Sequence, residues 1–436
     1  MAEIKPFRAM RFSTKNAGGI DSLTCPPYDI ISDSQREEYL KTNPYNIIRL
    51  ELPKGENPYR TAGNTLNEWL EKGILREDHL PGLYLYEEEF ELNGTKKSFR
   101  GVICRVKLTP FSEGIVLPHE NTLSKAKEDR FALMKATGCN FSCVYSLYLD
   151  EQRATEEKLS RLCAGSPNVE TNDGEVTHRL WVVSDPVAIE SICADFASRQ
   201  LFIADGHHRY ETALRYRDFC RENGLAASDD CDWVMMMLVD MQSDGLVVFP
   251  THRLLHDLPD FNAQALLSKC SEYFDIEPDL PLDAAEESLA AYYRREIPAF
   301  AFYGGGETCS LLSLRSRAAM DALFPEDAPC IRALDVSVLH RLILERLLGI
   351  DRENMANGIN LSYTRSKDEA IASVRSGACQ AAFLLNPTKI REIRDVAAAG
   401  EKMPQKSTYF YPKLITGLVM NRMDVRFPEE SSGLSF

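Results

Sequence analysis

An Asn-Gly pair between two extended runs constrains the fold more than any other feature of this sequence. The run LYLYEEEFEL precedes Asn93-Gly94, and the run SFRGVICRVKL follows it. A type I′ turn requires positive φ at both central residues, which Asn-Gly tolerates well, so the pattern predicts a β-hairpin from Pro81 to Leu108. Apolar residues at helical spacing between Tyr59 and Leu75 predict a helix that packs on this sheet. This part of the chain is therefore expected to be α+β.

Strand and helix patterns alternate through the rest of the chain. Two apolar runs, Trp233 to Val239 and Leu246 to Phe249, are joined by Ser243-Asp244-Gly245 and predict a second hairpin. At about 150 residues per domain, 436 residues indicate two or three domains. We expect a mixed-sheet α+β protein with an N-terminal α+β region at 1–150, a core at 151–258, an inserted subdomain at 259–329 and a C-terminal α/β region at 330–436.

Composition excludes several classes of protein. The 50 Lys and Arg against 65 Asp and Glu give a net charge of −15, which argues against a nucleic-acid partner because such a partner requires a basic surface. No apolar run is long enough to cross a membrane and the start is charged, so we expect a cytoplasmic protein with no membrane partner. The 12 cysteines are dispersed without a C-x-x-C pair, so we expect buried thiols and no metal site.

The segment LFIADGHHRYETAL, residues 201–214, is the most informative for function. An apolar strand runs into Asp205-Gly206, and a helix follows immediately. The backbone N–H groups of His207, His208 and Arg209 would then lie at a helix N-terminus, where anions are favoured. Glycine permits close approach of a ligand, and arginine adds a bidentate phosphate or carboxylate donor. The alternative is that Asp205 only caps the helix and Arg209 pairs with a neighbouring carboxylate.

The segment at 117–140 offers a carboxylate beside several cations. His119 and Glu120 follow a proline in a loop, and Lys125 and Arg130 come within a few helical turns. A carboxylate next to cations suits a general base that acts on a hydroxyl near a phosphate. The alternative is a solvated charged helix with i,i+4 pairs.

A third cationic segment, MPQKSTYFYPKL, lies near the C-terminus. Its Lys406 and Ser407 do not form a P-loop, because that motif requires glycine before the lysine and Gln405 stands there. Lys406, Ser407 and Lys413 remain candidates for phosphate contacts, unless the aromatic residues between them simply pack this segment on the core. The turn-rich segment Cys25-Pro26-Pro27-Tyr28-Asp29 is a weaker candidate to line a site.

The motifs DGHHR, PHENT and MPQKSTYFYPKL together resemble the domain-of-unknown-function family 1015, over essentially the whole chain. The DGHHR turn is further similar to that of the ParB/sulfiredoxin superfamily, including its free serine kinases. This resemblance implies a ParB/sulfiredoxin-like nucleotide-binding core in which residues 205–209 contact phosphates. It also implies phosphorylation of serine from a nucleotide with a carboxylate as base, although the catalytic glutamate of the kinases does not align with this sequence.

We therefore expect a phosphotransferase that acts on serine or phosphoserine with ADP or ATP and Mg²⁺. The expected catalytic residues are Glu120, His119, Asp205 and His208. The expected phosphate-binding residues are Gly206, His207, His208, Arg209, Lys125, Arg130, Lys406, Ser407 and Lys413. Two alternatives remain, a nucleotide-binding regulatory protein without catalysis and a phosphomonoesterase that needs no nucleotide.

Overall fold

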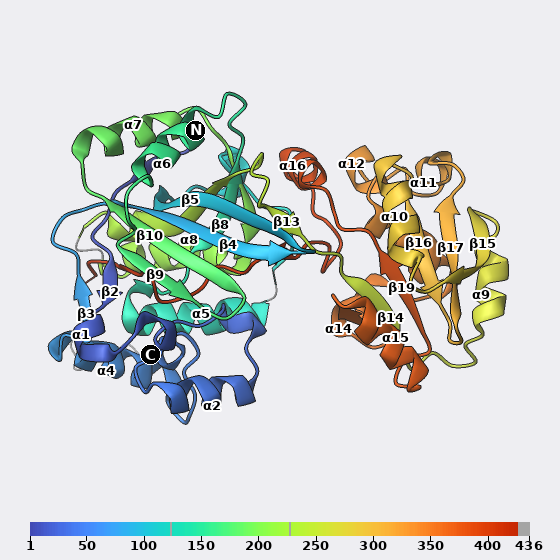
Figure 1. Cartoon of the computed structure of the whole chain (residues 1–436), viewed down its shortest axis with the longest axis horizontal. Coiled ribbons are helices and arrows are strands. Elements are labelled where there is room, and N and C mark those ends of the chain that lie inside the picture. The colour runs from blue at the N-terminus through green and yellow to red at the C-terminus, as the bar shows by residue number, and fades with distance from the viewer. Residues whose placement is uncertain (123, 226–227, 426–436) are drawn as a thin grey trace. The chain divides into compact units, whose positions relative to one another are not determined.

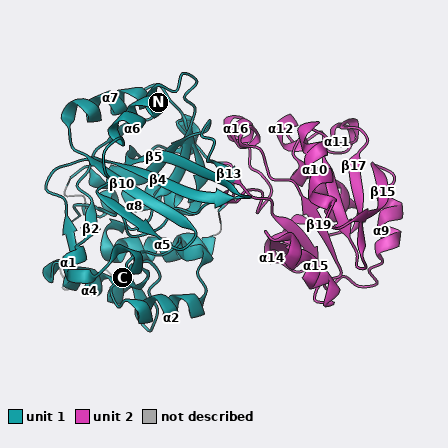
Figure 2. Ribbon diagram, viewed as in Figure 1, with its two compact units in different colours: residues 1–118, 122–247, 412–436 teal, residues 119–121, 248–411 magenta. Residues whose placement is uncertain are grey.

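The computed structural model describes residues 1–122, 124–225 and 228–425. The chain divides into two compact units (Figure 2). Unit 1 consists of residues 1–118, 122–247 and the segment from Pro412 onward, and unit 2 consists of residues 119–121 and 248–411. Unit 2 is thus almost entirely an insertion into the chain of unit 1.

Unit 1 is built on a mixed sheet, in keeping with the expected α+β class. In the described part of the chain this sheet has nine strands in the order β6-β11-β8-β12-β5-β4-β10-β9, with β1 on β5. The β6–β11 and β8–β12 pairs are parallel and the remaining pairs are antiparallel. The strands of the sheet are β1 (Ile4–Lys5), β4 (Leu83–Leu92), β5 (Thr95–Lys107), β6 (Val116–Leu117), β8 (Val144–Tyr148), β9 (Val169–Asn172), β10 (Val176–Val183), β11 (Leu201–Asp205) and β12 (Trp233–Asp240). Short pairs add β2 (Met10–Phe12) with β3 (Leu75–Glu77) and β7 (Cys139–Asn140) with β21 (Asn421–Arg422).

The predicted hairpin is confirmed. Strands β4 and β5 pair from Tyr84 with Ile103 to Leu92 with Thr95, and Asn93 and Gly94 have φ of 51° and 72°. Both central residues therefore adopt the left-handed conformation that the Asn-Gly pair predicts. The hairpin is visible as two long strands in Figure 1.

The helices of unit 1 pack in groups. α5 contacts both α8 and α4, and α6 contacts α7. The amphipathic helix predicted near Tyr59 is α4, which buries Ala62, Leu66 and Trp69. The helices are α1 (Thr14–Ala17), α2 (Asp33–Thr42), α3 (Ile48–Glu51), α4 (Pro58–Glu71), α5 (Ser124–Thr137), α6 (Ala154–Leu162), α7 (Pro186–Phe196) and α8 (His207–Glu222), with 3₁₀ turns η1 (Ile20–Ser22), η2 (Tyr28–Ile30), η3 (Phe111–Glu113) and η4 (Asp230–Asp232).

Unit 2 has its own antiparallel sheet, in the order β15-β17-β16-β19-β14-β18. Its strands are β14 (His252–Leu255), β15 (Phe274–Pro281), β16 (Ala299–Tyr303), β17 (Thr308–Leu314), β18 (Leu361–Thr364) and β19 (Ala381–Leu385). Its helices are α9 (Ala263–Cys270), α10 (Ala285–Arg294), α11 (Ala318–Leu323), α12 (Pro329–Arg332), α13 (Asp335–Val338), the π-helix η5 (Leu339–Leu347), α14 (Arg352–Asn357), α15 (Lys367–Arg375) and α16 (Ile390–Ala398). This sheet takes strands from both sides of residue 330, and the four-part division remains a prediction.

The second predicted hairpin is wrong. β12 is flanked by β5 and β8, so no edge of β12 is open to the run that follows it. That run instead forms β13 (Val247–Val248), which pairs with β20 (Phe410–Tyr411). The turn glycine, Gly245, packs against the backbone of Ser98, where a Cβ atom would lie 2.1 Å from the carbonyl oxygen.

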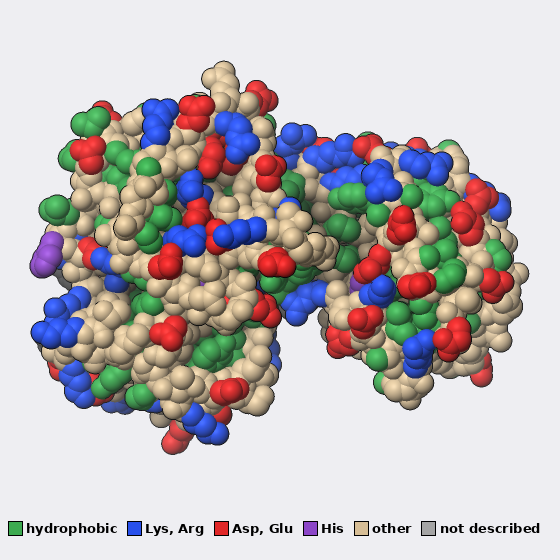
Figure 3. All heavy atoms as spheres, viewed as in Figure 1, with side chains coloured by type: hydrophobic (Ala, Val, Ile, Leu, Met, Phe, Trp, Pro, Cys, Tyr) green, Lys and Arg blue, Asp and Glu red, His purple; other side chains and the backbone are tan. Residues whose placement is uncertain are grey.

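Acidic and basic side chains are intermingled over most of the visible face of each unit (Figure 3). Among the described residues, none of the helices combines the length and the apolar character needed to span a bilayer. The cysteines of this part of the chain are all free thiols.

The tight contact between β5 and β12 predicts a specific sensitivity. A Cβ atom at Gly101 would lie 2.3 Å from the Leu238 carbonyl oxygen, which belongs to the backbone of the neighbouring strand β12. Gly101→Ala should therefore reduce the free energy of unfolding of unit 1 by about 3 kcal/mol. Gly165→Ala is the control, because nothing lies within 4 Å of its Cβ position. Thermal and urea unfolding measure both variants, and equal stabilities would contradict the packing described.

Candidate functional site

The candidate site lies in unit 1, where β11 runs directly into α8; the helix α8 is labelled in Figure 1. Gly206 is the N-cap of α8 and adopts φ 91° and ψ 27°, a left-handed conformation that favours glycine. A Cβ atom at this position would also lie 2.8 Å from Nε of Arg209. No side chain caps the start of α8. The partial positive charge of the helix N-terminus therefore lies at the site without a capping group.

Asp205 holds two cations next to this helix start. Its Oδ2 accepts a hydrogen bond from Nη2 of Arg209 at 2.7 Å, and its Oδ1 accepts one from Nζ of Lys413 at 2.8 Å. Arg209 also donates to the Cys143 carbonyl oxygen. Burial opposes ionisation of Asp205, but Lys413 and Arg209 outweigh it and hold the pKa of this carboxyl well below its usual range. Asp205 is therefore a fixed carboxylate that orients both cations.

A second layer of charges surrounds Arg209. Burial alone would lower the pKa of Arg209, but Asp205, Asp29, Tyr28 and Glu51 together raise it above its ordinary value. Burial raises the pKa of Tyr28 to about 12, because the nearby Arg130 and Arg209 only partly offset the loss of solvent. These interactions bring the turn η2 and the buried Glu51 into the electrostatic environment of the site.

Arg130 is engaged with protein groups. Its Nη1 donates to the Glu51 carbonyl oxygen at 2.8 Å, its Nη2 lies 2.6 Å from Oδ2 of Asp129, and its guanidinium lies 3.9 Å from the ring centroid of Tyr28. Only 5% of the Arg130 side chain is exposed, and its predicted contact with phosphate stays a prediction. Lys125 is exposed on the same helix, α5.

His208 is the titratable group beside the fixed cations. It is half-buried, and burial lowers its pKa below the ordinary value, although Glu211 partly opposes this effect. Oε2 of Glu211 accepts hydrogen bonds from Oγ1 of Thr122 and Nζ of Lys127, both at 2.8 Å. His208 is thus largely neutral at pH 7 and can accept a proton. The adjacent His207 is buried, with only 2% of its surface exposed.

The site residues predicted from the sequence are divided between the two units. Asp205, Gly206, His207, His208, Arg209, Lys413, Lys125 and Arg130 belong to unit 1, whereas His119, Glu120, Lys406 and Ser407 belong to unit 2. His119 is fully buried, with Nε2 3.1 Å from Oγ1 of Thr408, and Ser407 donates to the Pro404 carbonyl oxygen at 2.5 Å. Lys406 is exposed in a turn. The roles of these residues remain predictions.

Sequence reasoning gave little weight to three contributors. Asp29 lay in a segment rich in turn residues, whereas no motif singled out Glu51 or Glu211. The charges of Asp29 and Glu211 act on His208, and Asp29 and Glu51 act on Arg209. Only the proline-rich sequence before Tyr28-Asp29 signalled an unusual backbone there.

Comparison with known proteins places the chain in a family. The sequence profile of the family described as a protein of unknown function (DUF1015) matches residues 4–337, and the chain belongs to this family. A comparison with curated proteins finds no match.

Solved structures give weaker likenesses. A free serine kinase variant in complex with AMP is 14% identical, with a TM-score of 0.38, over 74% of this chain and 91% of that chain. The same kinase variant in complex with ADP gives a TM-score of 0.37 at 14% identity, with the same coverage. A conserved hypothetical protein from Pyrococcus furiosus is 13% identical, with a TM-score of 0.33, over 73% of this chain and 95% of that chain.

The ion pairs of Asp205 with Arg209 and Lys413 predict a pH-dependent loss of stability. Asp205→Asn leaves the buried Arg209 without its carboxylate and should cost about 2–3 kcal/mol at pH 7, below the full cost of a buried pair because Asp205 is 23% exposed. The pKa of Asp205 is depressed in the folded state, so its stabilisation is present above about pH 4 and lost as the pH falls further. The difference from the unsubstituted protein should therefore shrink below pH 4. Unfolding at pH 7 and pH 3 measures it.

A control for this substitution lies on α8, the helix that begins two residues after Asp205. Asp218 is 55% exposed and pairs with the adjacent Arg217. Asp218→Asn should change the free energy of unfolding by less than about 0.5 kcal/mol. If Asp205→Asn reduced the free energy of unfolding no more than Asp218→Asn, the ion pairs of Asp205 would not have the structural role assigned to them.

Proposed function

We propose that this protein transfers a phosphoryl group between a nucleotide and the hydroxyl of a small amino acid, with serine and phosphoserine as the pair. The start of α8 carries this proposal. There, Asp205 fixes Arg209 and Lys413 beside a glycine-capped helix N-terminus. A helix N-terminus with two oriented cations favours a phosphate group. Because the cations are held in advance, they need no reorganisation as charge develops.

His208 provides the proton acceptor in this proposal. Its depressed pKa keeps the imidazole largely neutral near pH 7, so it can take the proton of the substrate hydroxyl. The hydroxyl oxygen attacks the terminal phosphorus of the nucleotide, and the bond from that phosphorus to the bridging oxygen breaks. The diphosphate product leaves with the bonding electron pair. In the reverse direction, protonated His208 returns the proton to the serine oxygen.

Magnesium fits this site as part of the nucleotide complex. Among the described residues, no cluster of three His, Cys, Asp or Glu side chains could hold a metal ion. Mg²⁺ bound to substrate phosphates needs only one or two protein carboxylates. Asp29 is exposed, acts electrostatically on His208 and Arg209, and would hold such an ion, which would neutralise phosphate charge.

The proposal predicts a selective loss of turnover. His208→Ala should reduce kcat by about 100-fold or more, because general base catalysis is lost, while nucleotide affinity changes little. The rate of the unsubstituted protein should fall at acidic pH as the imidazole becomes charged, and it should do so at a lower pH than an unperturbed histidine would give, because the pKa of His208 is lowered by burial. The assay measures ADP formation from ATP and serine and, in reverse, ATP formation from ADP and phosphoserine, with Mg²⁺ in both. His79→Ala, at an exposed histidine of unit 1, is the control and should be unchanged.

Different outcomes separate the competing functions. Nucleotide binding without transfer in either direction would replace the proposal with a regulatory nucleotide-binding protein. Phosphate release from phosphoserine without nucleotide would replace it with a phosphomonoesterase. Full activity in Lys413→Met would also overturn it, because that variant loses one of the two fixed cations.

A further inference from the structure

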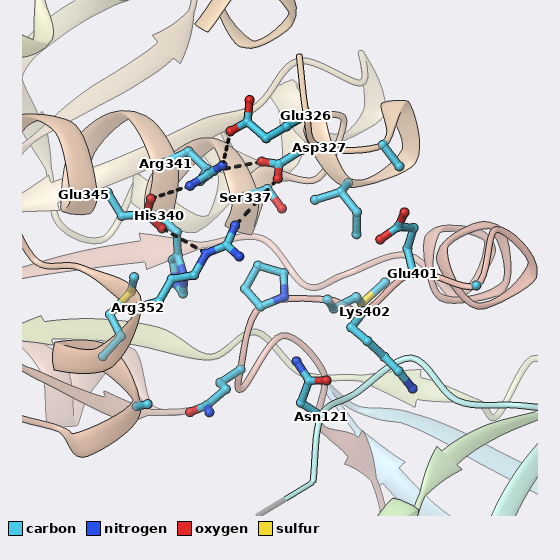
Figure 4. Close-up of a pocket in the computed structure, with 18 of the residues that line it drawn as sticks. Asn121, Glu326, Asp327, Ser337, His340, Arg341, Glu345, Arg352, Glu401 and Lys402 are labelled. Atoms are coloured by element: carbon cyan, nitrogen blue, oxygen red, sulfur yellow. Dashed lines mark hydrogen bonds and ion pairs between the residues drawn. The ribbon is translucent and has the colours of Figure 1, made fainter. Parts of the chain in front are cut away.

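Unit 2 contains two pockets of similar volume, which differ in how their charges are matched. Arg341 lies at the wall of the first, which has a volume of about 360 Å³. It bonds the carboxylates of Asp327, Glu345 and Glu326, as the dashed lines in Figure 4 show. The protein itself supplies the partners of these charges, so this pocket gives no reason to expect a charged ligand.

The second pocket, which we call the α16 pocket, has a volume of about 390 Å³. This volume lies within the range of small-molecule sites. The end of α10, the residue before α11, the start of α13 and the early part of α16 line the pocket, and all of them belong to unit 2. Figure 3 shows Lys and Arg side chains close together where Figure 1 places α16 and α12.

Among the described residues, four cations line the α16 pocket, and only two of them have an acidic partner. Arg391 pairs with Glu296, and Arg394 pairs with Asp395. These two cations are therefore balanced by the protein.

The other two cations, Arg317 and Lys389, have no carboxylate within ion-pair distance in the described part of the chain. Nη2 of Arg317 donates to the Glu296 carbonyl oxygen at 2.8 Å, and Nζ of Lys389 donates to the Tyr293 carbonyl oxygen at 3.1 Å. A guanidinium has five N–H donors and an ammonium group has three, so each cation keeps donors for a ligand. The positive charge of both groups is left without a counter-ion.

A carboxyl group without a partner lies at the same pocket. Asp335 is mostly buried, and among the described residues its side chain forms no hydrogen bond or ion pair. Burial and the neighbouring Glu392 raise the pKa of Asp335 to about 7, although Lys389 and Arg317 oppose this rise. Asp335 is thus about half protonated at neutral pH, and its protonated form can donate a hydrogen bond.

The other groups around Asp335 keep their usual charge near pH 7. Burial raises the pKa of Glu392, whose Oε2 accepts a hydrogen bond from the Lys389 backbone N–H at 2.9 Å. Tyr293 of α10 stays neutral, because burial raises its pKa to about 12. Arg253 of β14 lines a cavity of about 10 Å³ together with Asp335 and stays charged, with a pKa of about 10. Among these groups, Asp335 is the one whose pKa lies near 7.

From the two unpaired cations and the carboxyl group beside them, we propose that the α16 pocket binds a small oxyanion, the carboxylate or phosphate group of a metabolite. Arg317 and Lys389 hold the anion, and the protonated carboxyl of Asp335 donates a hydrogen bond to it. Binding takes up one proton from solvent at Asp335, because the ionised carboxylate would repel the anion. A cationic ligand would instead meet the two unpaired cations. The inference does not depend on the proposed phosphoryl transfer, whose groups lie in unit 1.

Equilibrium dialysis of the full chain against labelled sulfate, at pH 6 and pH 8 and constant ionic strength, tests this site. Sulfate does not titrate in this range, so a change in affinity reports on the protein. Sulfate should bind with a Kd below about 1 mM at pH 6. It should bind about tenfold more weakly at pH 8, because the protonated fraction of Asp335 falls by about that factor. Displacement of sulfate by acetate would assign the site to carboxylates, and retention of sulfate would assign it to phosphate groups.

Substitutions at the two unpaired cations locate the bound anion. Arg317→Met and Lys389→Met should each weaken binding at pH 6 by about tenfold, since each removes a charged hydrogen-bond donor. Arg315→Met is the matched control, because Arg315 is two residues away, pairs with Asp275 and does not line the pocket. Sulfate bound at the start of α8 would be retained in both Arg317→Met and Lys389→Met. The binding lost in these variants therefore measures the α16 pocket.

Asp335→Asn isolates the proton. The amide is a permanently neutral donor, so this variant should bind sulfate at pH 8 as tightly as at pH 6. Thermal unfolding should show that every variant is folded. The proposal is overturned if sulfate does not bind, if Arg317→Met and Lys389→Met both retain full affinity, if the unsubstituted protein binds equally at both pH values, or if Asp335→Asn keeps the pH dependence.

Discussion

The ion pairs of Asp205 fix the geometry on which the candidate site depends. One carboxylate takes a cation from the first turn of α8 and another from a segment 208 positions later. A left-handed glycine allows Arg209 to reach back to the residue before the helix. Neither cation alone would define a site, because a lone arginine or lysine on a helix surface is mobile and solvated. Held on one carboxylate, they present a fixed positive field at a helix start.

The two units use buried charge in different ways. In unit 1, Arg209 and Arg130 each lie beside a carboxylate, Asp205 and Glu51 respectively. In unit 2, Arg253 is surrounded by a histidine nitrogen, carbonyl oxygens and a tyrosine ring. Burial lowers the pKa of Arg253 to about 10, which leaves it charged at neutral pH. The first arrangement pairs cations with carboxylates, and the second holds a cation among neutral groups.

Local patterns in the sequence predicted local structure well. The hairpin at Asn93-Gly94 and the start of a helix at His207 both follow from turn chemistry within a few residues. The pairing of Leu246 to Phe249 could not be predicted in this way. Its partner strand, Phe410–Tyr411, is more than 150 residues away, and the competing edge on β12 is already filled. The same limit applies to the site, since no spacing rule connects Asp205 with Lys413 or Glu51 with Arg130.

The position of Lys413 in the sequence also determines when, during synthesis, its ion pair with Asp205 can form. Unit 1 closes only with the segment after Pro412, whereas every residue of unit 2 has been made before that segment. At about 5–20 residues per second, the ribosome adds the 208 positions between Asp205 and Lys413 in tens of seconds. During that interval Asp205 and Arg209 exist without the lysine. The ribosome therefore adds all of unit 2 before Lys413, and the candidate site gains its second cation only after the inserted unit has been translated.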